Sequence, residues 1–331
     1  MSVEMSPEQL AAAVAGFRQS RLILTAVELG VFTALRDGAR SSSAIATALG
    51  TEPRATDRLM NALAAIGLLG KAEGAFTNTT VAARHLVRGV QGYMGNIEHS
   101  IHLWDFWSHL TEAVRTGTVA DRVRLVERGE EWREAFMAAM HYRARTQAPA
   151  DINLIDFHDA VRVLDVGGGT GAYAMAMMHV KRDLSATVFD LPGIVPITRR
   201  YITEAGFDGR IEAVAGDYHT DPLPGGYDIV FLSAIVHSNS DEENARLIRK
   251  CADACNPGGC VIVQDFIMDD DRVTPPHGAL FAINMLVATE AGDTFTEAEV
   301  RAWMHAADLT AITRRDTPSG AAQIVGSKER A

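Results

Sequence analysis

The feature that most constrains this chain spans Val163 to Gly171 and reads VLDVGGGTG, an apolar run that ends in an acid and breaks into glycines. Such a run predicts a buried strand. Glycines at alternate positions permit left-handed backbone and leave no Cβ between the main chain and a ligand. Residues 172–180 continue as an apolar helix, whose first turn offers free N–H groups. The stretch therefore predicts a site for a nucleotide-like ligand.

Two cofactors compete for this site. Gly167-x-Gly169-x-x-Ala172 also satisfies the loose dinucleotide fingerprint, and Asp190 follows at about the spacing of a ribose-binding acid, so NAD is a candidate. The later order of features decides between them. The predicted features are a strand at 185–190, a strand at 211–214 before Gly216-Asp217, a strand at 227–232, and a turn at 256–259 before the apolar run 260–263.

This series resembles the class I S-adenosylmethionine (SAM) methyltransferases, α/β proteins with a Rossmann-like, doubly wound sheet. In that family the glycine loop faces the methionine half of SAM, the acid after the second strand holds the ribose, and the Gly-Asp after the third lies by the adenine. The resemblance favours SAM over NAD. It assigns cofactor contacts to Asp165, Gly167, Gly169, Gly171, Asp190, Leu191, Asp217, Tyr218 and Ser233.

Composition narrows the class of protein. The chain has 331 residues, 47% hydrophobic and 22% charged, which is enough for two domains with sizeable cores. Its net charge of −11 disfavours nucleic acid as a partner. We expect no membrane span and no secretion signal, and therefore a cytoplasmic protein. The three cysteines, Cys251, Cys255 and Cys260, are expected to be buried and reduced, without a zinc site.

Residues 1 to about 85 show helical periodicity, and residues 70–76 are typical of a small hairpin. This arrangement resembles a winged helix, a fold best known for binding DNA. The candidate recognition helix, 54–68, carries only Arg54 and Arg58 as basic residues, whereas a groove binder shows a basic stripe. The alternative is that the apolar segment 5–35 packs against a second copy of itself.

The whole chain resembles the small-molecule O-methyltransferases, which include plant phenolic, acetylserotonin and bacterial antibiotic-tailoring enzymes. The resemblance rests on the motifs VELGVF at 27–32, LDVGGGTG at 164–171, FDLP at 189–192 and INMLV at 283–287. It implies a winged-helix-like dimerisation domain at 1–100, connecting helices at 101–150 and a SAM domain at 151–331. It also implies a homodimer in which the N-terminal helices of one subunit wall the substrate pocket of the other.

His237 is the candidate general base, because it follows an apolar strand, and strand ends are where ligands bind in open α/β sheets. The family motif HDWSDE is here HSNSDE at 237–242, so the histidine is kept while its neighbours differ. A helix-capping or surface histidine is the alternative. Family position assigns the orienting acid to Asp265. Threonine stands where the family has a second acid, and Glu290 or Asp293 is a candidate replacement.

The acceptor pocket is expected to lie between helices on either side of the SAM domain. The residues predicted to line it are Met140, His141, Asn284, Met285 and Glu290. A metal site of His237, Asp265 and His277 is disfavoured, because the three come from separate loops and His277 is expected in a solvent loop. The sequence thus predicts methyl transfer from SAM to a hydroxyl of a small aromatic or polyketide-like metabolite. A carbon or nitrogen methyltransferase and a non-methylating SAM-binding regulator are the alternatives.

Overall fold

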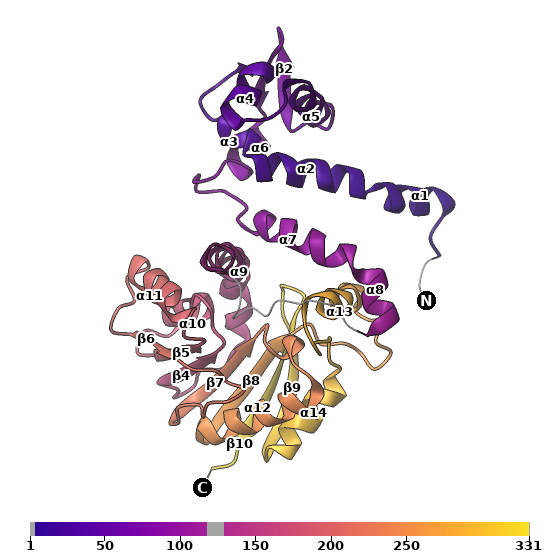
Figure 1. Cartoon of the computed structure of the whole chain (residues 1–331). Helices are drawn as coiled ribbons and strands as arrows, with labels where there is room; N and C mark the ends of the chain where they lie inside the picture. Colours follow the sequence, from indigo (N-terminus) through magenta and orange to yellow (C-terminus); the bar gives the residue numbers. More distant parts are fainter. Residues whose placement is uncertain (1–3, 118–128, 331) are drawn as a thin grey trace. The chain divides into compact units, whose positions relative to one another are not determined.

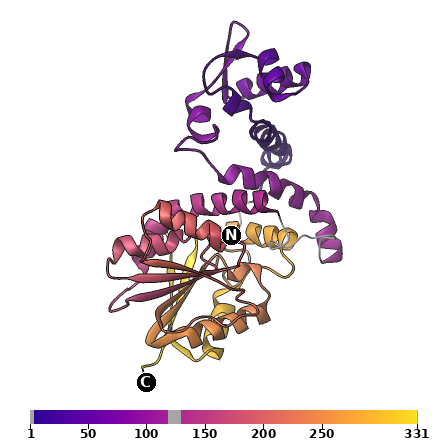
Figure 2. The same ribbon diagram turned by 60° about the vertical axis from the view of Figure 1, so that its left-hand side comes forward.

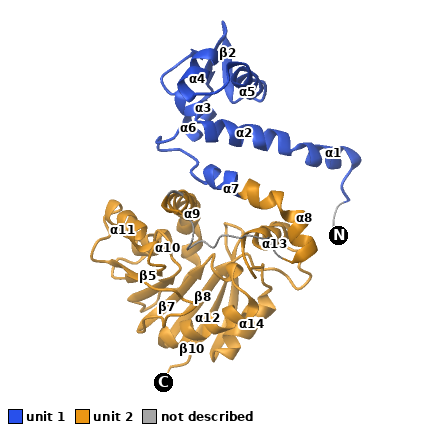
Figure 3. Ribbon diagram, viewed as in Figure 1, with its two compact units in different colours: residues 1–102 blue, residues 103–331 orange. Residues whose placement is uncertain are grey.

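The computed structural model describes residues 4–117 and 129–330, and the chain divides into two compact units, 1–102 and 103–331 (Figure 3). Each unit has its own hydrophobic core. Part of the connecting segment expected at 101–150 lies outside the described residues. Helices α8 (Leu110–Thr116) and α9 (Glu130–Asp151) belong to the second unit.

The first unit is a group of short helices with a three-stranded antiparallel sheet of order β1-β3-β2 (Figure 1). The hairpin predicted at 70–76 is confirmed, with Ala72 opposite Ala75. Side chains of Phe32, Met60 and Phe76 fill the core. The elements are α1 (Pro7–Ala15), α2 (Phe17–Leu29), α3 (Val31–Ala34), β1 (Arg40–Ser41), α4 (Ser42–Leu49), α5 (Pro53–Ala65), β2 (Leu69–Ala72), β3 (Ala75–Asn78) and α6 (Thr80–His85), and α7 (Asn96–Ser108) crosses the boundary between the units.

The expectation that no stretch is long and apolar enough to span a membrane is wrong, because one helical segment meets both criteria, length and composition. The helical segment Pro7–Leu29 has 23 residues, and only 17% of its most apolar window is buried. Leu10, Val14 and Phe17 are more than half exposed, and their spacing places them on one helical face. An apolar face of this kind calls for a covering surface.

The second unit contains a seven-stranded sheet of order β6-β5-β4-β7-β8-β10-β9 (Figure 2). The first five strands in this order run parallel, and β10 is antiparallel to both neighbours. The strands are β4 (Arg162–Val166), β5 (Ser185–Asp190), β6 (Ile211–Ala215), β7 (Tyr227–Ser233), β8 (Cys255–Asp265), β9 (Leu309–Asp316) and β10 (Ala322–Lys328). The turn predicted at 256–259 lies within β8, where pairing with β7 shifts register.

Helices cover both faces of this sheet. On one face α10 (Ala172–Val180) and α11 (Val195–Glu204) share a core with the strands, and on the other face α12 (Asp241–Ala254) and α14 (Glu297–Ala306) do so. The helix α13 (Pro276–Ala288) follows β8 in the chain. His277 is the second residue of this helix, so its placement in a solvent loop was wrong, although its side chain is exposed. All three cysteines are free thiols. Cys251 and Cys255 are buried, as predicted, whereas Cys260 is only partly buried.

Candidate active site

The predicted site residues gather at the carboxyl edge of the parallel strands. Because β4, β5, β7 and β8 run parallel, their carboxyl ends meet at one edge of the sheet. The glycine loop follows β4, Asp190 ends β5, Ser233 ends β7 and Asp265 ends β8. Four separate parts of the chain therefore deliver polar groups to one place.

The glycine loop has the backbone that its sequence predicts. Gly167, Gly169 and Gly171 have φ of 66°, 58° and 74°. A Cβ on Gly167 would lie 2.3 Å from the Cδ1 atom of Ile235, so a larger residue would have to displace that side chain as well as adopt a left-handed backbone. Thr198 Oγ1 donates a hydrogen bond of 2.6 Å to the carbonyl of Gly169, which fixes the loop from α11.

Asp190 ties this loop to β5. One carboxylate oxygen accepts a hydrogen bond from the Gly169 N–H at 2.8 Å, and the other accepts one from the Leu191 N–H at 2.7 Å. Burial raises the pKa of Asp190 to about 6, against the opposing effect of these two N–H groups. Each oxygen keeps a further lone pair, so the carboxylate suits a pair of adjacent hydroxyls such as those of a ribose.

Asp165 is a buried acid with an unsatisfied oxygen. Its side chain is almost fully buried, and its Oδ2 atom has no hydrogen-bond partner among the described residues. Burial raises the pKa of Asp165 to about 7, and the nearby Asp190 carboxyl adds to the shift. An acceptor of this kind beside a loop without side chains fits a cationic ammonium group, such as the one on the methionine half of SAM.

The remaining predicted cofactor contacts lie on neighbouring segments. Asp217 accepts a hydrogen bond from the His219 N–H at 2.9 Å, and the Tyr218 hydroxyl donates to Asn239 Oδ1 at 3.2 Å. Ser233 Oγ accepts a bond of 3.1 Å from Gln264. All three are partly buried. The structure thus brings together, around the glycine loop, residues that are far apart in the sequence.

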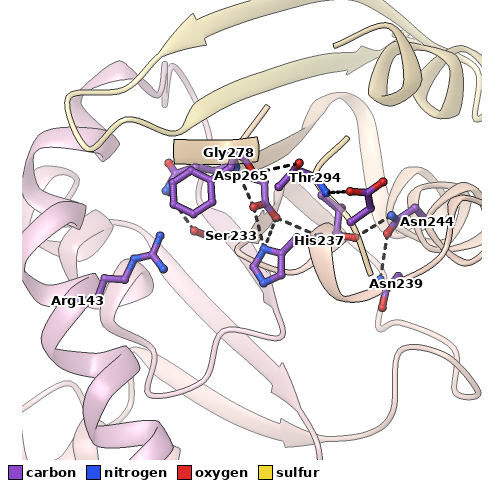
Figure 4. Close-up of polar contacts among 12 residues, drawn as sticks. Arg143, Ser233, His237, Asn239, Asn244, Asp265, Gly278 and Thr294 are labelled. Atoms are coloured by element: carbon purple, nitrogen blue, oxygen red, sulfur yellow. Dashed lines mark hydrogen bonds and ion pairs between the residues drawn. The ribbon is translucent and has the colours of Figure 1, made fainter. Parts of the chain in front are cut away.

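His237 and Asp265 form a close pair. His237 lies in the short 3₁₀ helix Val236–Ser238, and its Nδ1 atom is 2.8 Å from Asp265 Oδ1 (Figure 4). The side chains are 12% and 3% exposed. The cap of α12 is Ser240, which forms a capping box with Glu243, so the reading of His237 as a helix cap or surface residue was wrong.

The environment keeps Asp265 ionised. Burial alone opposes ionisation, but contact with His237 and hydrogen bonds from the N–H groups of Phe266 and His237 hold the pKa of this carboxyl below its ordinary value. An ionised carboxylate can only accept hydrogen bonds, so Nδ1 of His237 carries a proton. The other ring nitrogen, Nε2, is then a free acceptor in the neutral imidazole.

Two features around His237 were not predicted from the sequence. A Cβ on Gly292 would lie 2.3 Å from the His237 carbonyl oxygen, so glycine permits the segment after α13 to pack on the histidine backbone. Phe281 meets the His237 ring edge-on at 4.9 Å, and Phe266 meets Phe281 at 4.8 Å. The glycine in EAGD was visible in the sequence, but its partner was not.

The candidates for a second acid behave differently from each other. Asp293 reaches His237 through its main chain, because its N–H donates to the His237 carbonyl at 3.0 Å, while its carboxylate pairs with Arg272 at 3.4 Å. Glu290 is exposed. Thr294 is buried and donates to the carbonyl of Gly278 at 3.3 Å.

The predicted acceptor residues occupy two helices. On α13, Met285 is buried and Asn284 accepts a hydrogen bond of 3.0 Å from the Trp107 indole. On α9, Met140 is partly buried, whereas the His141 ring contacts Thr170 of the glycine loop at 2.8 Å. His141 therefore lies against the cofactor loop. Within residues 4–117 and 129–330, no group of three His, Cys, Asp or Glu side chains is arranged to hold a metal ion.

Comparison with known proteins decides the family. The O-methyltransferase domain model matches residues 107–309, and the O-methyltransferase dimerisation domain model matches residues 6–88. The chain belongs to the O-methyltransferase family. This O-methyltransferase uses SAM as its methyl donor, so the NAD alternative is excluded. The N-terminal helices form a dimerisation domain, and the protein forms homodimers through it.

Relatives of this O-methyltransferase match it over nearly its whole length. The 3-hydroxy-5-methyl-1-naphthoate 3-O-methyltransferase of Streptomyces sahachiroi is 33% identical over 96% of this chain and 94% of its own. Acetylserotonin O-methyltransferase of Bos taurus is 31% identical over 91% of this chain and 92% of its own. The solved structure of PigF with SAH is 25% identical, with a TM-score of 0.89 over 98% of this chain and 100% of PigF.

Proposed function

We propose that this O-methyltransferase methylates a hydroxyl of a small aromatic or polyketide-like metabolite, with His237 as the general base and Asp265 as its orienting acid. The observation that carries the proposal is the contact of 2.8 Å between His237 Nδ1 and Asp265. The names of relatives support the class of acceptor, since they include a hydroxynaphthoate and a tetracenomycin polyketide methyltransferase.

The residues at the strand ends fit the cofactor. Asp190 would hold the ribose hydroxyls, the glycine loop and Asp165 the methionine end, and Asp217 with Tyr218 the adenine side. When bound, SAM supplies a methyl group on a sulfonium, which is open to direct displacement. The protein holds the acceptor in line and excludes water, and such positioning is worth roughly 7 to 11 kcal/mol of the barrier.

His237 removes the proton that the acceptor hydroxyl loses as the new bond forms. A phenol titrates near pH 10 and an ordinary histidine near 6.5, so a neutral imidazole at pH 7 takes the proton only as the oxygen becomes bonded to carbon. Asp265 keeps the proton of the resting ring on Nδ1 and stabilises the cation that forms when Nε2 is protonated. Asn284 and Met140 are proposed to line the acceptor pocket, together with Met285 and Glu290.

The test is replacement of His237 by glutamine, with 1-naphthol and 3-hydroxy-1-naphthoate as acceptors. We expect kcat to fall about 10²- to 10⁴-fold, the usual contribution of a positioned base, while the Kd for SAM stays within twofold. His179→Gln is the matched control, because His179 is exposed at the end of α10. Unchanged turnover in His237→Gln would refute the base. Methylation of carbon or nitrogen, identified in the product by NMR, would favour the alternative chemistry.

The cellular setting is also a proposal. We propose a cytoplasmic homodimer that has a small-molecule acceptor and binds neither nucleic acid nor membranes. The negative net charge of −11 and the scarcity of basic residues on α5, Arg54 and Arg58 alone, support the absence of nucleic acid.

A further inference from the structure

An arginine on α9 lies beside the aromatic side chains that pack near His237, the proposed base. The guanidinium carbon of Arg143 lies 5.1 Å from the centre of the Phe266 ring. Phe266 in turn contacts Phe281, and Phe281 contacts the His237 ring. Figure 4 shows the Arg143 side chain extending from its helix toward the side of the site that holds Ser233 and His237. All of these residues belong to the second unit.

Arg143 is a partly buried cation that donates a hydrogen bond to a neutral side chain. Its Nε atom donates to Gln147 Oε1 at 3.2 Å, and within the described parts of the second unit no carboxylate pairs with it. Asp265, the acid that ends β8 just before Phe266, is already engaged by His237 and two N–H groups. The two terminal nitrogens of Arg143 are left for a planar, bidentate anion such as a carboxylate.

The position of Arg143 favours the acceptor over the cofactor as the source of this anion. Met137 and His141, on another stripe of α9, face the glycine loop, where the methionine end of SAM is expected. Arg143 faces Phe266, which follows β8, and β7 separates β8 from the loop-bearing strand β4 in the sheet. The aromatic rings beside the guanidinium also suit a flat acceptor.

We propose that Arg143 binds an anionic group of the acceptor, so that this enzyme selects hydroxylated aromatic carboxylic acids over their neutral analogues. The inference rests on the proposed function for the location of the acceptor pocket. Arg143 sets specificity and orientation, and His237 remains the group that takes the proton. The aromatic ring is held against Phe266 and Phe281, and the carboxylate against the two terminal guanidinium nitrogens.

The experiment measures binding without methyl transfer. The Kd values of 1-naphthoate and of 1-naphthamide, which have no hydroxyl to methylate, are determined by calorimetry on the wild-type protein saturated with S-adenosylhomocysteine. We expect the carboxylate to bind about 10- to 100-fold more tightly than the amide, the usual effect of hydrogen bonds to a charged group. In Arg143→Met the two ligands should bind within about twofold of each other, and Arg143→Lys should retain part of the preference.

Arg145→Met is the matched control, because Arg145 is exposed on the same helix, and it should keep the wild-type preference. Equal binding of the two ligands to the wild type, no binding of either, or an unchanged preference in Arg143→Met would overturn the proposal. A tenfold loss of S-adenosylhomocysteine affinity in Arg143→Met would assign the arginine to the cofactor carboxylate and also overturn it. Because no methyl is transferred, a failure here is distinct from a failure of His237→Gln to lose turnover.

Discussion

At the scale of single residues, Asp265 determines which ring nitrogen of His237 carries the proton. Its Oδ1 accepts from the Phe266 N–H at 2.8 Å and contacts His237 Nδ1, while Oδ2 accepts from the His237 N–H at 3.4 Å. Each of these groups donates a hydrogen bond to Asp265, so only a side chain that accepts on both of its terminal atoms satisfies all of them. An amide would turn its NH₂ group toward one of these donors.

We therefore predict that Asp265→Asn lowers kcat about 10²- to 10³-fold, with the Kd for SAM unchanged, because the ring is no longer held in one tautomer. Steady-state rates and calorimetry measure the two effects. A decrease in SAM affinity as large as the decrease in kcat would contradict this, since it would indicate a collapsed site.

The same substitution gives a pH-dependent loss of stability. The pKa of Asp265 is lower in the folded protein than its ordinary value of 3.8, so its contribution to folding is complete above that pH and disappears as the pH falls through the folded value. The difference in unfolding free energy between wild type and Asp265→Asn, from urea melts, should be constant from pH 6 to 8. It should shrink below pH 3.8.

The sequence predicted the pair but not its surroundings. His237 and Asp265 are placed by strand ends and by family position, and the fold brings them within 2.8 Å. Phe281 and Gly292 come from other segments, and nothing local in the sequence indicates that they meet at His237, or that Arg143 lies against Phe266. Contacts of this kind depend on how helices pack on the sheet, which the periodicity of one segment does not specify.

At the scale of elements, α9 packs against the glycine loop and supports it. His141 Nδ1 is 2.8 Å from the Thr170 hydroxyl, and Met137 packs with Ile194 and Ile197 beside Leu191. Burial, with a contribution from Arg145, lowers the pKa of His141 to about 4. The ring is therefore neutral from pH 5 to 8, and its contact with the loop does not change in that range.

We predict that Thr170→Val, which keeps the shape and removes the hydroxyl, weakens SAM binding about 3- to 10-fold, by the value of one hydrogen bond. Calorimetry at pH 6 and pH 8 should give the same loss, since His141 stays neutral. The control is Thr187→Val, which removes the partner of the Tyr227 hydroxyl at 2.9 Å inside the sheet. That variant should have a lower melting temperature than the wild type and an unchanged Kd for SAM. Equal SAM affinities for all three proteins would contradict the proposed support of the loop by α9.

The elements were predictable where their signals are local. The strands at 185–190 and 211–215, the hairpin of the first unit and the helix at 172–180 lie where the apolar runs place them. The strands β9 and β10 were not predicted, and β10 inserts antiparallel between β8 and β9. The order of strands in a sheet depends on how the connections between strands cross over the sheet, and the pattern of a single segment does not specify these connections. The proline and glycines at 257–259 resemble a turn, yet β8 begins before them at Cys255, and its pairing with β7 shifts register there.

At the scale of the whole molecule, we assign the apolar face of the N-terminal helices to the dimer interface. The family model begins at residue 6 and so includes the exposed face of Leu10, Val14 and Phe17. Residues at positions i, i+4 and i+7 form one stripe on a helix, and a symmetric partner buries such a stripe against its own copy. The segment passes a composition test for a membrane span, but a second subunit covers an apolar stripe equally well.

We predict that the double substitution Leu10→Glu and Phe17→Glu converts the dimer to a monomer, because it places charges on the stripe that the partner buries. Light scattering should give twice the chain mass of 35.7 kDa for the wild type and one chain mass for the variant. Val180→Glu, at an exposed position 52% accessible on α10, should remain dimeric. If the N-terminal helices also wall the partner's pocket, the monomer should bind SAM and lose turnover. A variant that stays dimeric, or a wild type that sediments with lipid vesicles, would contradict the assignment of this face to the second subunit.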